Sequence, residues 1–520
     1  MYELSLAVSV ISFIVVLLFV VRRPSFNIHN PLMIYLIFHF VIFVVRPIVA
    51  YFMTFEGLYA AYDFMPSMSD KITVIYASNL GFLTFTFFCL QQGDVPMEFR
   101  RDAIDEVERR RLTQVFIWVW AICGPVALYS ALRSTQSFLG GDFVQGMILD
   151  RGTGAFINTS SNGYLTDAQF MFVTLCGLLA WIGRFRPLAM TPLVLFVIYR
   201  SMTGSRIMFV YALMIAALFF AYERKIRLPS WRVVALALLP ILLFRMVGDD
   251  RGASIRQTLG TEAKEQILTG DNRVKLRTLE SMDYGNMEFF EYLVYAVPQR
   301  SGTYDYFLDN FQVLTEPVPR VLWSGKPIGE PFRRIFLFNY GFPIGMTRSL
   351  PGEGWYALGW LGVVIWCGLW GGILGRVYRK FAEGRQTTLQ TAAYCVYMPS
   401  LIAFFRDGQL ITFVKQLGMF MVPILVWYLI ARFMSVPTAA ELRAAWRLRM
   451  QRARSGPALV VAVGGAVPAP AMSAPAMPAV VTRRAAAATA AARMLPPAVR
   501  RRREALGQLP GTRPDPAIGG

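Results

Sequence analysis

Residues Pro298–Trp360 read PQRSGTYDYFLDNFQVLTEPVPRVLWSGKPIGEPFRRIFLFNYGFPIGMTRSLPGEGWYALGW. This stretch mixes charged side chains with aromatic residues, prolines and glycines, and its end runs directly into the apolar segment 355–376. Most of the chain before residue 248 is apolar by contrast. A polar stretch of this kind beside long apolar segments predicts a membrane protein that holds a polar site at one face of a bilayer.

The composition supports a membrane protein. Of the 520 residues 55% are hydrophobic and only 16% are charged, whereas about a quarter of a soluble chain is charged. Several apolar runs approach or exceed the ~18 residues that indicate a bilayer-spanning helix. We therefore expect an all-α polytopic membrane protein with about eleven spans. The expected spans are residues 3–21, 31–53, 72–90, 113–132, 166–183, 187–200, 206–222, 232–247, 355–376, 391–405 and 411–434.

The basic residues fall in alternate connections between these spans, which predicts the orientation because such loops face the cytoplasm. They include Arg22, Arg23, Arg100, Arg101, Arg109, Arg110, Arg111, Arg184, Arg186, Arg224, Lys225, Arg227, Arg376, Arg379 and Lys380. The N-terminus and the long loop then lie outside, and the C-terminal tail lies in the cytoplasm. The expected regions are N-terminal transmembrane helices (1–247), a long extracytoplasmic loop (248–354), C-terminal transmembrane helices (355–434) and a tail (435–520).

The tail explains about half of the chain's net charge of +19, because residues 437–520 hold 13 Arg against three acidic residues, a net +10. It begins as a basic juxtamembrane helix, ELRAAWRLRMQRAR, and continues as an Ala/Pro/Gly-rich sequence that is typical of disorder. Basic charge next to the last span favours contact with anionic membrane lipid. We therefore expect no nucleic-acid partner.

Cations on the outer side are the first candidates for a site, because Arg and Lys bind phosphate groups. They are Arg206, Arg300, Arg320, Lys326, Arg348 and Arg406. Carboxylates beside them can accept a proton from a hydroxyl nucleophile. Glu353 is the first candidate for this base, and Asp249 and Glu288 are the reserves. Arg46, deep in the second span, is interpreted as a structural bridge or a second functional cation.

The chain has only two histidines, His29 and His39, and neither falls in an expected outer loop. A histidine base, a Ser-His-Asp triad and a His-rich metal site are therefore not expected on the outer face. The five cysteines all lie in apolar runs, so no disulfide framework is indicated. No cofactor and no metal are expected.

Three motifs carry a family resemblance: TGSR at 203–206, PVPRVLWSGKP at 317–327, and MTRSLPGEGWYALGWLG at 346–362. Together with the long outer loop they resemble the Wzy-type O-antigen and exopolysaccharide repeat-unit polymerases, over about residues 200–410. The resemblance implies a bacterial inner-membrane glycosyltransferase of GT-C-like architecture that needs no metal. Its substrate would be an undecaprenyl-diphosphate-linked oligosaccharide, and a chain-length regulator and a flippase are candidate partners.

On this interpretation Arg206, Arg348 and Arg406 bind the diphosphate. Lys326, Arg300 and Arg320 assist at the rim of the site, and Glu353 activates the acceptor hydroxyl. Two alternatives stay open besides a non-catalytic scaffold for polysaccharide export. One is an O-antigen ligase-like glycosyltransferase, although that family uses an outer histidine. The other is a transporter or flippase of lipid-linked glycans.

Overall fold

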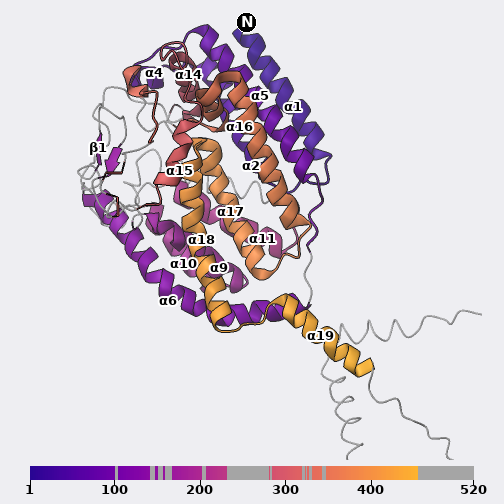
Figure 1. Cartoon of the computed structure of the whole chain (residues 1–520). Coiled ribbons are helices and arrows are strands. Elements are labelled where there is room, and N and C mark those ends of the chain that lie inside the picture. Colours follow the sequence, from indigo (N-terminus) through magenta and orange to yellow (C-terminus); the bar gives the residue numbers. More distant parts are fainter. Residues whose placement is uncertain are drawn as a thin grey trace, which may run out of the picture. The chain divides into compact units, whose positions relative to one another are not determined.

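The computed structural model describes most of the chain before residue 455. The described residues are 1–99, 103–140, 147–149, 156–158, 165, 167–201, 206–230, 280, 284–318, 322–323, 325–326, 331–341 and 347–454. Residues Met1–Met450 form one compact unit, separate from Gln451–Gly520. The described chain is helical apart from one antiparallel pair of short strands, β1 (Met147–Leu149) and β2 (Phe156–Asn158) (Figure 1).

Seven of the described helical segments are long and apolar enough to cross a membrane. They are α1 (Tyr2–Val21), the run α2–η1–α3 (Pro31–His39, Phe40–Val45, Arg46–Met53), α5 (Met68–Gly93), α6 (Ala103–Gly140), α16 (Leu350–Ala382), α17 (Thr388–Asp407) and α18 (Leu410–Phe433). Three shorter apolar helices are α9 (Gln169–Ile182), α10 (Pro187–Ser201) and α11 (Arg206–Glu223). The described chain is therefore that of a helical, membrane-embedded protein with several spans.

Ten of the eleven expected spans coincide with these helices. The remaining one, 232–247, lies outside the described residues. Three of the ten, at α9, α10 and α11, coincide with the shorter apolar helices and are not among the seven candidate spans. The expectation of helices at these places is confirmed, whereas the count of eleven crossings stays a prediction.

Local sequence signals set several helix starts. Asn30 accepts a hydrogen bond from the backbone N–H of Leu32 at the start of α2. Capping boxes begin two other helices: Ser67 with Asp70 opens α5, and Thr387 with Gln390 opens α17. Each box satisfies backbone donors that the first turn of a helix would otherwise leave without partners.

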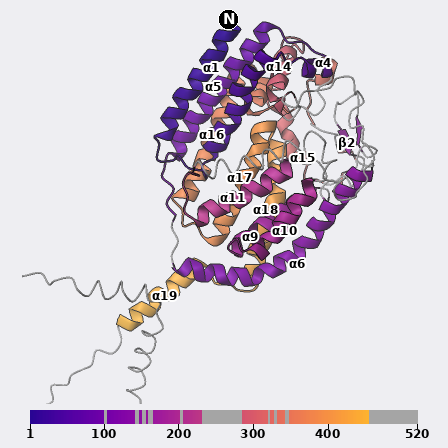
Figure 2. The same ribbon diagram turned by 180° about the vertical axis from the view of Figure 1, so that it is seen from behind.

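The pair α5 and α16 runs side by side and forms the most extensive helix contact of the molecule (Figure 1). Glycine makes this contact close. A Cβ atom on Gly375 would lie only 2.4 Å from the carbonyl oxygen of Cys89 on α5. Small residues allow such close approach of backbones between membrane helices. A second group of helices surrounds α9, which packs against α6, α10, α11 and α18 (Figure 2).

Short elements lie in the connections between these helices: α4 (Gly57–Ala61), α14 (Asn286–Ala296), η4 (Leu308–Phe311), α15 (Gln312–Thr315) and η5 (Leu337–Asn339). One of them, α14, has no polar face in water. Its residues are buried almost all around, including Glu288 and Glu291, where it packs against α5 and α16. Its acidic residues are therefore inside the bundle, which the sequence pattern did not indicate.

The basic helix expected after the last span is α19 (Ala439–Arg454). Its first turns are held to α6 by two polar contacts. The N–H of Ala439 donates to Glu108 at 2.9 Å, and Arg443 forms an ion pair with Asp105 at 2.5 Å. The start of the tail is therefore joined to the compact unit.

Candidate functional site

Arg348 lies immediately before α16, and its guanidinium lies between two carboxylates. Nη1 donates to Glu353 Oε2 at 3.0 Å, and Nη2 donates to Asp309 Oδ2 at 2.9 Å. The guanidinium carbon also lies 3.9 Å from the centre of the Tyr356 ring. Arg348 is only 9% exposed and Glu353 is fully buried. We call Arg348, Glu353, Asp309 and Asp305 the Arg348 cluster.

The start of α16 explains how two members of this cluster meet. Ser349 is the N-cap, and its side-chain oxygen accepts a hydrogen bond from the N–H of Gly352. The next turn places Glu353 where its own N–H donates to the carbonyl oxygen of Ser349 at 2.9 Å. Arg348, one residue before the cap, therefore lies within reach of a carboxylate in the first turn.

The segment that contains Asp305 and Asp309 is fixed to α16 by its backbone. The N–H of Asp305 donates to the carbonyl of Tyr356 at 3.1 Å, and the N–H of Asp309 donates to Asp305 Oδ2 at 3.1 Å. Burial, followed by the neighbouring charge of Asp309, raises the pKa of Asp305 to about 8. Asp305 is therefore mainly protonated at neutral pH. The cluster thus places one guanidinium among three buried acidic side chains.

Asn310 connects the cluster to the start of α18. Its side-chain nitrogen donates to Glu353 Oε1 at 2.9 Å, and its side-chain oxygen accepts the N–H of Leu410 at 3.1 Å. Both carboxylate oxygens of Glu353 are thus engaged, one by Asn310 and the other by Arg348. Asp309 and Asp305 differ from Glu353, because the Oδ1 of each is buried and has no hydrogen-bond partner among the described residues.

Arg406, in the last turn of α17, joins the same region through its backbone. Its carbonyl oxygen accepts the N–H of Ser349 at 2.8 Å and the side-chain N–H of Asn286 at 2.8 Å. Asn286 also donates to the carbonyl of Thr347 at 2.9 Å. The starts of α14 and α16 and the end of α17 therefore meet at one point.

The side chain of Arg406 is half-buried, and its situation contrasts with that of Arg348. Its Nε is buried without a hydrogen-bond partner. Among the described residues no carboxylate forms an ion pair with it. A cation with a desolvated donor and no ion pair within 4 Å among the described residues suits an anionic ligand.

A second buried pair lies between α3 and α14. Arg46 Nη2 lies 2.6 Å from Glu288 Oε1, and both side chains are almost completely buried. Next to it Tyr59 donates its hydroxyl hydrogen to Glu291 at 2.5 Å. Burial, followed by the charge of Glu288, raises the pKa of Glu291 to about 8. The structure thus supports Arg46 as a bridge and places Glu288, a reserve base, in an ion pair.

The other predicted site residues lie apart from the cluster or outside the description. Arg300 donates to the carbonyl of Tyr295 at 2.5 Å and covers its ring. Lys326 donates to the carbonyl of Glu316 at 2.9 Å. Arg206 is the first residue of α11, and the structure does not describe its side chain. Asp249 and Arg320 lie outside the described residues.

Four polar members of this region were not assigned by sequence reasoning: Asp309, Asn310, Tyr356 and Asn286. The sequence could have indicated the two acids, because Asp305 and Asp309 are four residues apart in the same polar stretch as Arg348. The roles of Asn310 and Asn286 depend on contacts with α18 and α17, which are distant in the sequence.

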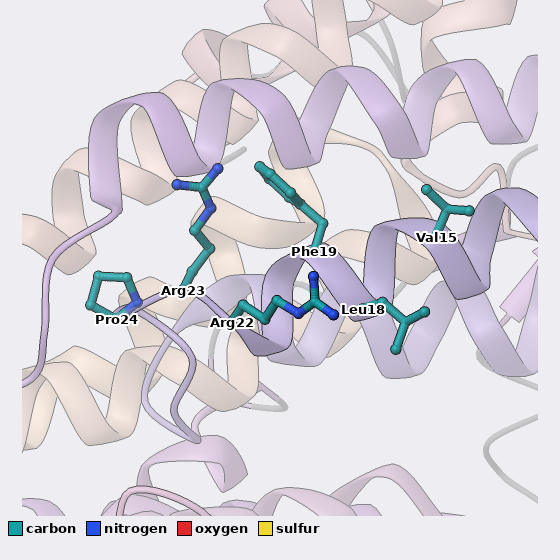
Figure 3. A pocket seen from close by; sticks show the side chains of 6 residues that line it. All are labelled: Val15, Leu18, Phe19, Arg22, Arg23 and Pro24. Atoms are coloured by element: carbon teal, nitrogen blue, oxygen red, sulfur yellow. The ribbon is translucent and has the colours of Figure 1, made fainter.

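A groove of about 530 Å³ lies at the C-terminal end of α1 (Figure 3). It is lined by Val15, Leu18, Phe19, Arg22, Arg23 and Pro24. Arg23 covers the Phe19 ring and forms an ion pair with Asp94 at 3.5 Å. None of the predicted site residues lines this groove, so it is not part of the Arg348 cluster.

Within the residues that the structure describes, no group of three or more His, Cys, Asp or Glu side chains is arranged to hold a metal ion. Comparisons of the chain with protein-family models, with curated proteins and with solved structures gave no match. The assignment of a function therefore depends on the sequence motifs and on the geometry of the cluster.

Proposed function

We propose that this chain is a Wzy-type polymerase that joins undecaprenyl-diphosphate-linked oligosaccharide repeat units at the outer face of a bacterial inner membrane. The motifs around Arg206, Arg320 and Arg348 support the family. The observation that carries the proposal furthest is the side chain of Arg406, a half-buried cation without an ion-paired carboxylate among the described residues. Its backbone holds the start of α16, where buried acids gather around Arg348.

In the proposed reaction a hydroxyl oxygen of the acceptor sugar attacks the anomeric carbon of the donor glycan. The bond from that carbon to the diphosphate oxygen breaks, and the diphosphate leaves with the electron pair. Arg406 stabilises the charge that develops on the leaving group. The hydroxyl proton passes to a carboxylate of the Arg348 cluster.

The structure distinguishes the acids that could accept this proton. Glu353, the base expected from the sequence, has both oxygens engaged by Arg348 and Asn310. Asp309 and Asp305 each keep a buried Oδ1 without a hydrogen-bond partner among the described residues. In our proposal Asp309 is the proton acceptor, and Glu353 positions Arg348. Asp305 is less suited to this role at neutral pH, because its raised pKa keeps it protonated.

The proposed orientation places the Arg348 cluster on the periplasmic side. The start of α1 lies beside the end of α3, where Tyr51 donates to Glu3 at 2.5 Å. On the same helix, Arg46 pairs with Glu288 of the outer element α14. The other end of α1 carries Arg22 and Arg23, which fits a cytoplasmic loop under the positive-inside rule.

Reconstitution in liposomes with a purified undecaprenyl-diphosphate-linked repeat unit tests this function. We expect the wild type to lengthen the glycan and Arg406→Gln to lower the rate about 100-fold, as loss of one donor to a developing charge does in other enzymes. Arg379→Gln is the matched control, because Arg379 is an exposed arginine that pairs with Glu383 on its own helix. A wild type that moves lipid-linked glycans across the bilayer without lengthening them would instead be a flippase.

A further inference from the structure

Exposed aromatic side chains lie directly beside the Arg348 cluster. Tyr306 follows Asp305 in the sequence and is 48% exposed, and Phe311 follows Asn310 and is 46% exposed. Phe332, from a neighbouring segment, is 57% exposed. The same short segment therefore directs its carboxylates inward and two aromatic rings outward.

Backbone and ring contacts hold this segment in place. The N–H of Tyr306 donates to the carbonyl of Ala357 at 2.8 Å, and the inward-facing ring of Phe307 lies 5.4 Å from that of Trp366. The rings of Phe311 and Phe332 meet edge to face at 6.0 Å. The guanidinium of Arg334 lies 5.5 Å from the centre of the Tyr306 ring. We call Tyr306, Phe311, Phe332 and Arg334 the aromatic face.

The position of the aromatic face argues for a ligand in water. None of its four residues belongs to a helix long and apolar enough to cross a membrane. A contiguous exposed apolar patch marks a surface that contacts a ligand, another protein or a membrane. The face of an aromatic ring carries partial negative charge, which suits the C–H groups on one side of a sugar ring. The guanidinium adds hydrogen-bond donors for hydroxyl groups.

We propose that the aromatic face binds sugar rings of the acceptor oligosaccharide and so delivers its hydroxyl to the Arg348 cluster. This inference rests on the proposed function. Phe311 is two residues from Asp309, so the aromatic face and the proposed proton acceptor belong to one short stretch of the chain. The aromatic face supplies binding and orientation, and it takes part in no bond-breaking step.

The kinetics of the reconstituted enzyme test the proposal. At saturating donor, Phe311→Ala and Phe332→Ala should each raise the KM for the acceptor about tenfold, while kcat stays within about twofold, since stacking on one ring contributes on the order of a tenfold difference in other systems. Phe311→Tyr keeps the ring and should restore the KM. Phe87→Ala is the matched control, because Phe87 is an exposed phenylalanine of the span α5.

Direct binding separates failure of this inference from failure of the proposed function. The oligosaccharide released from its lipid should bind the wild type and bind Phe311→Ala about tenfold more weakly in calorimetry, whether or not the protein polymerises. If wild type and Phe311→Ala bind that oligosaccharide equally, or if the acceptor KM does not change, the inference is wrong. Lack of glycan lengthening by the wild type would contradict the function alone.

A spin label tests whether the face contacts lipid instead. The five native cysteines are all buried, so a nitroxide on Phe311→Cys can be attached selectively. Collisions with a water-soluble nickel chelate should exceed those with oxygen, which concentrates in the bilayer. The opposite result would assign the aromatic face to the membrane and overturn the proposal.

Discussion

Ser349 and Arg406 are joined backbone to backbone, with the N–H of Ser349 2.8 Å from the carbonyl oxygen of Arg406. This hydrogen bond ties the start of α16 to the end of α17. Arg348, which pairs with two acids, is the residue before Ser349. Arg406 differs, because its Nε has no hydrogen-bond partner among the described residues. The candidate site is therefore assembled by main-chain contacts, and side-chain chemistry is added to that frame.

The tightness of this junction predicts that Gly408→Ala is strongly destabilising. Gly408 has φ +74°, and a Cβ there would lie 2.1 Å from the carbonyl oxygen of Ser349. The left-handed conformation alone costs a non-glycine residue about 1–2 kcal/mol. The clash of the new Cβ with the Ser349 carbonyl oxygen adds to this loss of stability. We expect a large loss of folded protein in fluorescence-detected size-exclusion chromatography after heating.

Gly418→Ala is the matched control for that experiment. Gly418 lies within α18, and no atom lies within 4 Å of a Cβ built there. Alanine favours a helix interior over glycine by about 1 kcal/mol, so this variant should be as stable as the wild type or more so. Equal stability of the two variants would mean that the junction at Ser349 is loose.

Replacement of Arg348, the only cation of the Arg348 cluster, should strongly lower the stability of the folded protein. Arg348→Met leaves Glu353 and Asp309 buried without their counter-ion, and breaking a buried pair in this way costs about 3–5 kcal/mol. Arg348→Met combined with Glu353→Gln and Asp309→Asn should recover part of that loss. The midpoint temperature of unfolding in detergent measures both effects.

Arg379→Met is the control variant, and its midpoint temperature of unfolding is compared with that of Arg348→Met. The pair of Arg379 with Glu383 is about half exposed, and such surface pairs contribute less than about 1 kcal/mol. If Arg348→Met lowers the midpoint no more than Arg379→Met does, the charges of the cluster are already screened by water. The buried description of the site would then be wrong.

Glu291 predicts a pH dependence of stability. Its pKa is about 8 in the folded protein, because of burial and the charge of Glu288, against a usual 4.5. Between these values the folded state keeps a proton that the unfolded state has lost. Stability should therefore fall as pH rises from about 4.5 to 8 and then level off.

Glu291→Gln removes this titration, so the variant should lose less midpoint temperature between pH 5 and pH 8 than the wild type does. Glu383→Gln, at an exposed position, should keep the wild-type dependence. Identical pH profiles for the wild type and Glu291→Gln would show that Glu291 is ionised in the fold.

The sequence predicted the helices well because apolar runs and basic loops are local signals. It left Arg46 open between a structural bridge and a functional cation, because Glu288, its partner, is 242 residues away and no periodic pattern links them. Arg348 was expected to bind a diphosphate, and the structure surrounds it with Asp309 and Glu353. Arg348 is paired with acids because the segment with Asp305 and Asp309 packs against α16 through its backbone. Such backbone contacts leave no pattern in the sequence, so the pairing could not be predicted.

The pair of Arg46 and Glu288 supplies the last prediction. Both side chains are about 4% exposed and Nη2 lies 2.6 Å from Oε1, so each single replacement leaves a buried charge. Arg46→Met and Glu288→Met should each destabilise the protein by about 3–5 kcal/mol, whereas the double variant should lose much less. The coupling energy of this double-mutant cycle measures the interaction directly, because the two residues contact each other. A near-zero coupling would show that Arg46 and Glu288 each have another partner, and Glu288 would then again be a candidate base.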